Sequence, residues 1–370
     1  MYTNIKNGKL KVGIIGCGII AGTKHIPSLS KLDNVEIGAF FDVDIEKAKK
    51  VSVEYGYERS KIYDDYEKLL ENEDIDVIHV CTPNKYHSQI TIKALKAGKY
   101  VMCEKPMALS TAEAREMVEV SKSTGKKLTI SFQNRFKADS QYLHRICENG
   151  ELGEIYLAKA LAIRRRGVPT WGKYLSMEEQ GGGPLVDIGS HSLDLALWMM
   201  NNYRPKFVVG NVYNKIGSKK GSVNEWGPWD PEKFMVEDSA FGFITMENGA
   251  TIILETSWAL NSLQDGGIQT VLCGTEGGAD TLDGVRLNGE KNGALYSMYP
   301  SIGKNKIAFN QLKVESPNDI EIRLWIECIL NDTLPVVKAE EALVVTEILD
   351  AIYISANTKK PVYFNNHYML

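Results

Sequence analysis

The chain opens with an alternation of short apolar runs and amphipathic stretches. The apolar runs are rich in β-branched residues and predict strands at residues 11–15, 35–41, 76–80, 100–103 and 128–132. Helical periodicity between them predicts helices at residues 19–31, 45–55, 66–71, 88–97 and 111–124. Ser110 followed by Glu113 is typical of a helix start, and Gly125 stands where a helix C-terminus favours glycine. Because the strands are apolar on both faces, this β-α-β order predicts a parallel sheet covered by helices.

The pattern changes after Arg135. A helix is expected at 137–149, a long strand at 154–166 and a further helix at 188–200. Strand-like runs then cluster at 206–216, 237–246, 251–258 and 268–273, with a hairpin signal at 247–249, and helices at 319–330 and 339–356 close the chain. We therefore predict an α/β protein with a Rossmann-type parallel-sheet domain over residues 1–133. An α+β domain with an open, mainly antiparallel sheet would follow over residues 134–370.

Composition agrees with two folded domains and excludes several classes of protein. The chain has 370 residues, 44% of them hydrophobic, which is too long for one ordinary core and apolar enough to fill two. A formal net charge of −4 argues against nucleic acid as the main partner. No apolar run approaches the roughly 20 residues of a membrane span, and residues 1–11 are polar, without a signal-peptide core. We therefore expect a cytoplasmic protein with no membrane partner.

Six cysteines are spread along the chain without a C-x-x-C pair. None stands beside clustered histidines, so neither a disulfide framework nor a metal site is expected. This usage fits a reducing compartment.

The strongest chemical signal is a glycine-rich turn after the first strand. Gly16-Cys17-Gly18-Ile19-Ile20-Ala21 fits G-x-G-x-x-A and opens a helix. Gly16 permits a tight turn, Gly18 lets the backbone approach a pyrophosphate, and the N–H groups at Ile19 and Ile20 point toward the anion. The alternative is a glycine turn in a domain that binds no nucleotide.

Asp42 ends the second predicted strand, where a carboxylate can accept hydrogen bonds from the ribose hydroxyls of a dinucleotide. A carboxylate there would repel a 2′-phosphate, so NAD is favoured over NADP. Asp44 could substitute as the ribose contact, although the start of the following helix suggests a capping residue.

Two later strand ends should face the same crevice, because ligands bind at the carboxyl ends of parallel strands. The first carries Thr82 and Asn84, which could line the cofactor, with His87 just beyond as a cofactor contact or as a solvated or capping residue. The second carries Glu104-Lys105-Pro106. Glu104 could contact the cofactor or position the Lys105 loop.

These motifs together resemble a known family. The glycine-rich turn, Asp42, Thr82-Pro83-Asn84 with His87, Glu104-Lys105-Pro106 and the segment from Gly181 through Asp187 to His191 match the glucose–fructose oxidoreductase / inositol dehydrogenase / MocA family in order and spacing. The resemblance implies a Rossmann domain followed by an α+β domain that binds substrate and forms homodimers or homotetramers through its sheet. It also implies hydride transfer between a nicotinamide cofactor and a sugar or cyclitol hydroxyl. The family's lysine, aspartate and histidine map to Lys105, Asp187 and His191, and its pattern suggests a cis Lys105–Pro106 peptide.

Elementary chemistry supports these roles. Oxidation of a secondary alcohol needs a base for the hydroxyl proton, and histidine suits that task because its pKa lies near neutral pH. We interpret His191 as the acid/base, Lys105 as the group that polarises the substrate oxygen, and Asp187 as a substrate ligand or partner of His191. The sequence does not decide which of Lys105 and His191 takes the proton. The alternative for Asp187 and His191 is a helix N-cap with a histidine whose hydrogen bonds are satisfied within the protein.

Further substrate contacts are expected from the region after residue 133. The candidates are Arg135 at the domain junction, Arg166 at the end of the long strand, and Trp171 beyond it. The arginines could bind an anionic group or be solvated surface charge. Trp226 and Trp229 lie in the irregular segment 217–231 and could face a sugar ring, form a local hydrophobic cluster or contact another subunit.

Three functions fit these motifs. The first is an NAD-dependent dehydrogenase of a sugar, sugar derivative or cyclitol. The second is a redox-neutral glycosidase that oxidises and re-reduces its sugar with a permanently held NAD, using the same residues. The third is a non-catalytic nucleotide-binding sensor, which would be expected to have lost the lysine or the histidine.

Overall fold

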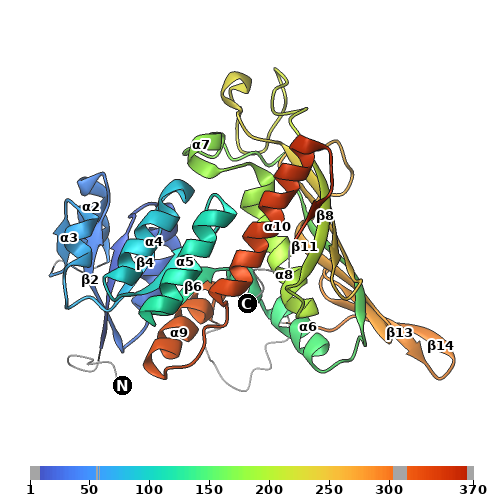
Figure 1. The fold of residues 1–370 in the computed structure, drawn as a ribbon, viewed down its shortest axis with the longest axis horizontal. Helices are drawn as coiled ribbons and strands as arrows, with labels where there is room; N and C mark the ends of the chain where they lie inside the picture. Colours follow the sequence, from blue (N-terminus) through green and yellow to red (C-terminus); the bar gives the residue numbers. More distant parts are fainter. Residues whose placement is uncertain (1–8, 56, 58, 303–314, 365–370) are drawn as a thin grey trace. The chain divides into compact units, whose positions relative to one another are not determined.

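The computed structural model describes residues 9–55, 57, 59–302 and 315–364 (Figure 1). The chain divides into two compact units. The first comprises Met1–Phe136 with Lys313–Leu343, and the second comprises Lys137–Leu312 with Val344–Leu370.

A six-stranded sheet with all neighbours parallel forms the centre of the first unit. Its strands, in spatial order, are β3 (Lys61–Tyr63), β2 (Val35–Phe41), β1 (Leu10–Ile15), β4 (Val77–Val80), β5 (Tyr100–Glu104) and β6 (Leu128–Ser131). This is the Rossmann strand order, and the direction of progression reverses between β1 and β4, where such sheets bind their ligands. The predicted parallel-sheet fold is confirmed, whereas the short edge strand β3 was not predicted.

Helical segments connect these strands. In chain order they are η2 (Ala21–His25), α1 (Ile26–Leu29), α2 (Ile45–Glu54), α3 (Tyr66–Leu70), η3 (Asn84–Tyr86), α4 (His87–Lys96), α5 (Thr111–Thr124) and η4 (Gln133–Phe136). Ser110 caps α5 by accepting a hydrogen bond from the Glu113 N–H at 3.3 Å. Gly125 ends the helix with a left-handed φ of 65°. Asp44 accepts the Glu46 N–H at 3.2 Å, so it caps α2 as its position suggested.

Helix α9 (Pro317–Leu330) belongs to the first unit although it lies far along the chain. Ile322, Trp325 and Ile326 are buried in the same apolar cluster as residues of β1, β2 and α1. Each such side chain contributes about 1.5–3 kcal/mol when fully buried. Ser28 of α1 also donates a hydrogen bond to Asp319 at 2.7 Å. The sequence predicts this helix but not what it packs against.

The second unit holds a nine-stranded sheet. Its strands are β7 (Ile155–Ile163), β8 (Pro205–Tyr213), β9 (Ser239–Met246), β10 (Thr251–Ser257), β11 (Gly267–Gly274), β12 (Gly277–Asp280), β13 (Arg286–Lys291), β14 (Ala294–Met298) and β15 (Val362–Tyr363). The spatial order is β14-β13-β12-β11-β7-β10-β9-β8-β15, and β7 with β10 is the single parallel pair among them. The predicted mainly antiparallel sheet is confirmed; strands β12 to β15 were not predicted.

Helices cover one face of this sheet. They include α6 (Ala138–Glu148), η5 (Leu185–Gly189), α8 (Ser190–Met200) and α10 (Ala339–Thr358), with the short α7 (Met177–Gln180) and η6 (Pro231–Lys233) in the loops. Ile352 of α10 lies so close to the strands that a Cβ at Gly210 or Gly242 would come within 2.8 and 2.7 Å of it. Glycine at these two positions therefore allows the helix to approach the sheet.

The opposite face carries no helix of this unit in the described chain. There Val209 pairs with Phe243, and Phe243 pairs with Ile253, which makes an apolar cross-strand row. Phe243 is 47% exposed and Val209 39% exposed.

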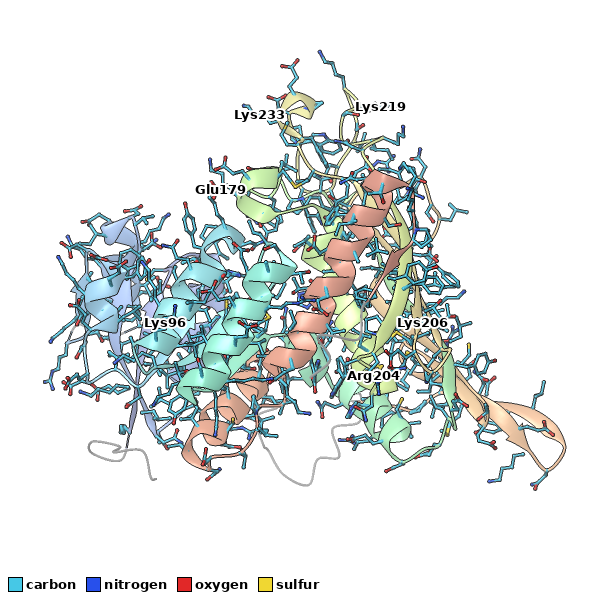
Figure 2. All side chains as sticks on the ribbon, in the orientation of Figure 1. Lys96, Glu179, Arg204, Lys206, Lys219 and Lys233 are labelled. Carbon is cyan, nitrogen blue, oxygen red and sulfur yellow. The ribbon has the colours of Figure 1, made fainter. Side chains whose placement is uncertain are left out.

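Charged side chains point outward from both units. Lys96, Lys206 and Lys219 are examples, labelled in Figure 2. Within the described residues, no helix combines the length and the apolar character that crossing a membrane requires.

Candidate functional site

Gly16 stands directly after β1 and beside the end of β4. Its φ of 92° is left-handed, and a Cβ there would lie 2.7 Å from the carbonyl carbon and oxygen of Cys81. Gly18 differs, because nothing lies within 4 Å of the place its Cβ would take. The first glycine is therefore required by the protein's own packing, whereas the second leaves an open approach to the backbone.

Ile19 and Ile20 follow Gly18 and are 70% and 43% exposed, while Ala21 is fully buried. The helix then starts with a π-helical turn, η2, a local geometry found often at functional sites. Exposed isoleucines beside an open glycine backbone fit a surface that a bound nucleotide would cover.

Asp42 follows β2 and connects to the glycine-rich turn. Its Oδ2 accepts a hydrogen bond from the Cys17 N–H at 2.8 Å, and its Oδ1 accepts the Asp44 N–H at 2.9 Å. Each carboxylate oxygen has two lone pairs, so one remains on each oxygen for a ribose hydroxyl. Asp42 thus fixes the turn and can still recognise a ribose.

The end of β4 carries an unsatisfied polar group. Thr82 Oγ1 is buried and has no hydrogen-bond partner among the described residues, which is costly unless a ligand supplies one. Asn84 is half-buried at the start of η3. His87 is not solvated: it is 1% exposed, and its ring nitrogens lie 2.7 Å from Pro106 O and 2.9 Å from Thr82 O. Through these contacts His87 links the loop after β4 to the loop after β5, so its ring serves the protein structure rather than a cofactor.

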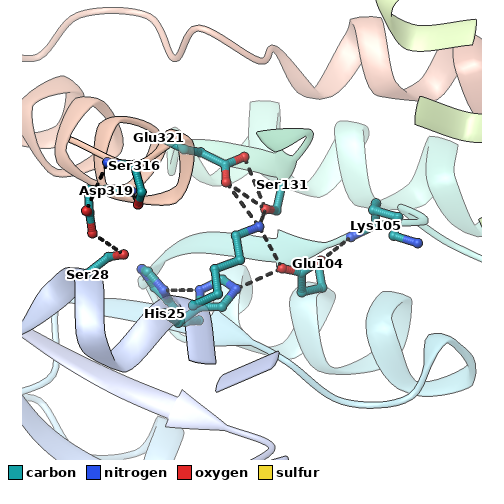
Figure 3. Close-up of polar contacts among 10 residues, drawn as sticks. His25, Ser28, Glu104, Lys105, Ser131, Ser316, Asp319 and Glu321 are labelled. Carbon is teal, nitrogen blue, oxygen red and sulfur yellow. Dashed lines mark hydrogen bonds and ion pairs between the residues drawn. The ribbon is translucent and has the colours of Figure 1, made fainter. Parts of the chain in front are cut away.

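Glu104, at the end of β5, is only 8% exposed and faces a cluster of buried polar groups (Figure 3). Its Oε1 lies 2.9 Å from both Lys24 Nζ and His25 Nε2. Its Oε2 accepts the Lys105 N–H at 3.2 Å. Burial alone would raise the pKa of Glu104, but the Lys24 ammonium and the His25 hydrogen bond hold it well below its usual value. Its contacts are therefore those of a carboxylate that positions the Lys105 loop.

Lys105 itself is half-buried, and the Lys105–Pro106 peptide is cis, as the family pattern suggested. Three candidate groups of the first unit, the glycine-rich turn, Thr82 and the Glu104–Lys105 segment, thus lie at the carboxyl ends of β1, β4 and β5, which are neighbours in the sheet.

The buried histidines predict a pH dependence of stability. Burial lowers the pKa of His25, His79 and His87. Below about pH 6.5 the unfolded chain binds protons that the folded chain refuses, so stability is lost as the pH falls, by up to about 1.4 kcal/mol per pH unit per histidine. The raised pKa values of the carboxyls of Glu321, Glu237 and Asp76 oppose this loss, because the folded chain keeps protons there that the unfolded chain has released. We expect the thermal midpoint to drop between about pH 7.5 and 5.5, and less steeply in His79→Gln; a midpoint that stays constant or rises would contradict it.

In the second unit, Asp187 lies in the π-helical η5 and His191 in α8, which follows without a break. Asp187 Oδ2 accepts a hydrogen bond from Trp258 Nε1 at 3.1 Å, and His191 is 4% exposed. In this helical segment the two side chains, four residues apart, share one side.

The glycines before Asp187 pack against the protein rather than leaving open backbone. A Cβ on Gly182 would lie 2.0 Å from the Tyr353 hydroxyl, and one on Gly183 would lie 2.2 Å from Glu237 O. Glu237, which is buried, accepts hydrogen bonds from the N–H groups of Gly183 and Leu185 at 2.9 and 3.1 Å and from the Tyr353 hydroxyl at 2.8 Å. No sequence motif indicates these contacts, which fix the start of the helix that carries Asp187.

Arg164, rather than Arg166, stands beside Asp187. Arg164 Nη1 lies 4.0 Å from Asp187 Oδ2, and its guanidinium lies 4.9 Å from the Trp226 ring centroid. The Arg166 guanidinium instead donates to the carbonyls of Arg165 and Leu260 and to Asn261 Oδ1. Both arginines lie beyond β7, which ends at Ile163, so the alternation of strand side chains does not distinguish Arg164 from Arg166.

Aromatic residues surround this arginine. Trp171 is 46% exposed, and its ring lies 5.2 Å from Trp226 and 5.9 Å from Tyr174. Tyr174 in turn contacts Trp258, the hydrogen-bond donor to Asp187. Trp229 packs instead against Phe234 and donates to Gly217 O at 2.7 Å. Trp171 and Trp226 are therefore partly exposed aromatic side chains in the group around Arg164, next to Asp187. Trp229 instead stabilises the loop 217–231 through its contacts with Gly217 and Phe234.

Arg135 has a different role from the one predicted. It is fully buried in the first unit, and its guanidinium donates to Glu341 Oε2 at 2.7 Å and to Val336 O at 3.2 Å. A guanidinium buried against a carboxylate ties residues 336–341 to η4 and is not presented to a ligand.

The residues present fit a dinucleotide. Gly18 offers open backbone for a pyrophosphate, Asp42 keeps acceptor capacity for a ribose, and Thr82 Oγ1 needs a partner. Across residues 9–55, 57, 59–302 and 315–364, no group of three or more His, Cys, Asp or Glu side chains could hold a metal ion. Together, the fold and these groups define an NAD-binding oxidoreductase.

Comparison with known proteins gives the same class. The family model of an oxidoreductase family with an NAD-binding Rossmann fold matches residues 10–132, and the model of its C-terminal alpha/beta domain matches residues 145–364. The chain therefore belongs to the glucose–fructose oxidoreductase / inositol dehydrogenase / MocA family, and the cofactor is NAD.

Individual relatives extend this result. D-glucoside 3-dehydrogenase of Escherichia coli is 36% identical over 97% of this chain and 98% of its own length. Myo-inositol 2-dehydrogenase of Thermotoga maritima is 30% identical over 58% of this chain and 63% of its own. An oxidoreductase domain protein of Kribbella flavida has the same fold, with a TM-score of 0.82 at 20% identity over 97% of this chain and all of that one.

Proposed function

We propose that this protein oxidises a secondary hydroxyl of a D-glucoside, with the C3 hydroxyl as the reacting position. The observation that carries the proposal is the 36% identity to D-glucoside 3-dehydrogenase along almost the whole chain. We further propose that residues 1–133 bind NAD and that residues 134–370 bind the substrate and form the oligomer contact.

The proposed roles follow from the local geometry in each unit. Either His191 takes the hydroxyl proton while the Lys105 ammonium stabilises the charge that develops on the substrate oxygen, or a neutral Lys105 takes the proton itself. NAD, held at the glycine-rich turn and Asp42, would supply the hydride acceptor. Asp187, held by Trp258, accepts hydrogen bonds from neighbouring sugar hydroxyls. Trp171 and Trp226 offer exposed faces to the C–H side of a sugar ring or to the aglycone.

A direct assay tests both the proposed substrate class and the carbon that is oxidised. Purified protein is mixed with NAD and methyl α- or β-D-glucoside, and NADH is followed by absorbance. Methyl 3-deoxy-D-glucoside and myo-inositol serve as matched alternatives, and NADP replaces NAD in parallel. We expect NADH from the glucosides alone, and little reduction of NADP because Asp42 repels its phosphate. Turnover of the 3-deoxy compound would overturn the choice of carbon.

The same assay separates the redox-neutral alternative. A glycosidase that re-reduces its sugar would release methanol from the methyl glucoside without net NADH. Build-up of NADH in proportion to the oxidised sugar supports the dehydrogenase.

We propose that the protein works as a homodimer or homotetramer in the cytoplasm. Its six free thiols support a reducing compartment. The open sheet face with the row Val209, Phe243 and Ile253 supports self-association, because an open apolar sheet face on each copy could bury the other.

Phe243→Glu is expected to dissociate the oligomer, since it places a charge in that apolar row. Light scattering coupled to size exclusion gives the mass. Leu334→Glu is the control, because Leu334 is 76% exposed outside the sheet. A monomeric wild-type protein, or a Phe243→Glu variant of unchanged mass, would refute this interface.

A further inference from the structure

A lysine that the sequence analysis did not select lies beneath the Glu104–Lys105 segment. Lys24, in the π-helical turn after the glycine-rich motif, is 6% exposed. Its Nζ lies 2.9 Å from Glu104 Oε1 and 3.1 Å from Glu321 Oε2, and it donates to Ser131 Oγ (Figure 3). A buried ammonium between two carboxylates is costly to desolvate, and it is tolerated only when its donors are all satisfied.

Four segments of the first unit meet in this cluster. They are η2 with Lys24 and His25, the end of β5 with Glu104, the end of β6 with Ser131, and α9 with Glu321. Ser131 Oγ lies 3.0 and 3.1 Å from the two Glu321 oxygens. The cluster therefore links the nucleotide-binding turn to the Lys105 loop and to α9, which begins more than 200 residues after Lys105.

The two carboxylate oxygens of Glu104 have different hydrogen-bond partners. Oε1 receives Lys24 and His25, and Oε2 receives the Lys105 N–H. Because the carboxylate is planar and rigid, contacts that fix Oε1 also fix the position of Oε2. The orientation of the Lys105 backbone is thereby set by Lys24 through Glu104.

The charges in the cluster do not cancel unless one carboxyl holds a proton. Burial and the nearby Glu104 raise the pKa of Glu321, whereas Lys24 keeps Glu104 ionised. His25 and His79 stay neutral because burial lowers the pKa of both, and their Nδ1 atoms lie 2.8 Å apart. A neutral His25 that donates from Nε2 to Glu104 must then accept from His79 at Nδ1. Lys24 lies within ion-pair distance of both carboxyls, and its ammonium lowers the pKa of each against the effect of burial.

We propose that Lys24 and Glu321 are positioning residues for Lys105, acting through Glu104. This inference rests on the proposed catalytic role of Lys105. The chemistry stays at Lys105 and His191, and the cluster keeps the Glu104 carboxylate ionised and oriented so that the Lys105 backbone is held in one place.

Lys24→Met is the primary test, because methionine keeps the length of the side chain and removes the charge. We expect kcat to fall up to about 100-fold, as for other small displacements of a reacting group. The dissociation constant for NADH should change less than about threefold, because Lys24 is buried below the turn. Hydrogen exchange at the Lys105 amide should become faster, since its acceptor is no longer fixed.

The pH profile of kcat in Lys24→Met distinguishes a positioning role from a general loss of structure. Without the ammonium, Glu104 takes up a proton at higher pH, so the acidic limb of kcat should move upward by about one pH unit or more. The variant keeps the other titratable groups that interact with Glu104. They are His25 of η2, His79 of β4, Cys81 after β4, His87 of α4, Cys103 of β5 and Glu321 of α9.

A double variant removes the stability effect. Lys24→Met combined with Glu321→Gln leaves one carboxylate in the cluster and should recover the thermal midpoint. Under the proposal, kcat stays low and the Lys105 amide still exchanges quickly. Lys99→Met is the matched control, because Lys99 is another buried lysine of this unit, whose Nζ donates to Asn72 O and Ile75 O at 2.7 and 2.8 Å.

Three outcomes would overturn the positioning role of Lys24. A Lys24→Met enzyme with kcat within twofold of wild type overturns the inference, and so does a double variant that regains kcat together with its thermal midpoint. Equal losses in Lys99→Met would show general damage and also overturn it. If Lys105→Ala keeps turnover, the proposed function fails instead, which distinguishes the two failures.

Discussion

Lys105→Ala is expected to lower kcat by at least about a thousandfold while leaving NADH binding intact. The substitution removes the positive charge that stabilises the developing alkoxide, and each such charge or proton-transfer group contributes roughly 10²- to 10⁴-fold. Single-turnover kinetics with glucoside and fluorescence titration with NADH give the two quantities. Lys96→Ala is the matched control, since Lys96 is exposed on α4 (Figure 2).

His191→Ala should cause a comparable loss, and the pair of variants identifies the proton acceptor. The base is the residue whose loss removes the acidic limb of the pH profile of kcat. Substantial turnover in both variants would refute the proposed chemistry, because no other group in it takes the hydroxyl proton.

Gly18→Ala and Gly16→Ala are expected to fail in opposite ways. Nothing in the protein meets a Cβ on Gly18, so this variant should keep its thermal midpoint but bind NADH much more weakly. Gly16 has a left-handed φ of 92°, and a Cβ there would meet the Cys81 carbonyl at 2.7 Å, so Gly16→Ala should lose about 2 kcal/mol or more of stability.

Thermal melts with and without NADH measure both effects. The wild type gains stability from the bound cofactor in proportion to the logarithm of its saturation. Gly18→Ala should melt like wild type alone and gain little from NADH. A Gly18→Ala enzyme with normal NADH stabilisation would contradict the placement of the pyrophosphate at this turn.

Local signals predicted the elements of the first unit because each strand and helix there carries its own pattern. The glycine-rich turn, the Ser110 cap and the Asp44 cap depend on residues close in sequence. The strand β3 escaped prediction because it has only three residues, none of them buried. Strands β13 and β14 escaped because their residues are mostly exposed, so no alternation with a buried face marks them.

The sequence indicated which residues belong to the candidate site more reliably than it indicated what each residue does there. Asp187 and His191 belong to a motif, but their support by Glu237 and Trp258 depends on contacts between residues up to 71 positions apart. His87 and Glu104 are candidates because they follow strand ends, and Arg135 because it stands at the domain junction. Tertiary contacts indicate structural roles for them, since their side chains bond to other protein groups, and for Glu104 this was one of the two expected roles.

The sequence by itself determined the order of strands and helices, the glycine-rich turn with Asp42, and the motif residues Lys105, Asp187 and His191. These features depend on short-range periodicity and spacing. Only the tertiary structure decided that α9 completes the first unit and that Glu321 reaches Lys24 there. It also placed Arg164 rather than Arg166 beside Asp187. Such contacts join residues far apart in the chain, and no local pattern records which partners will satisfy a buried charge.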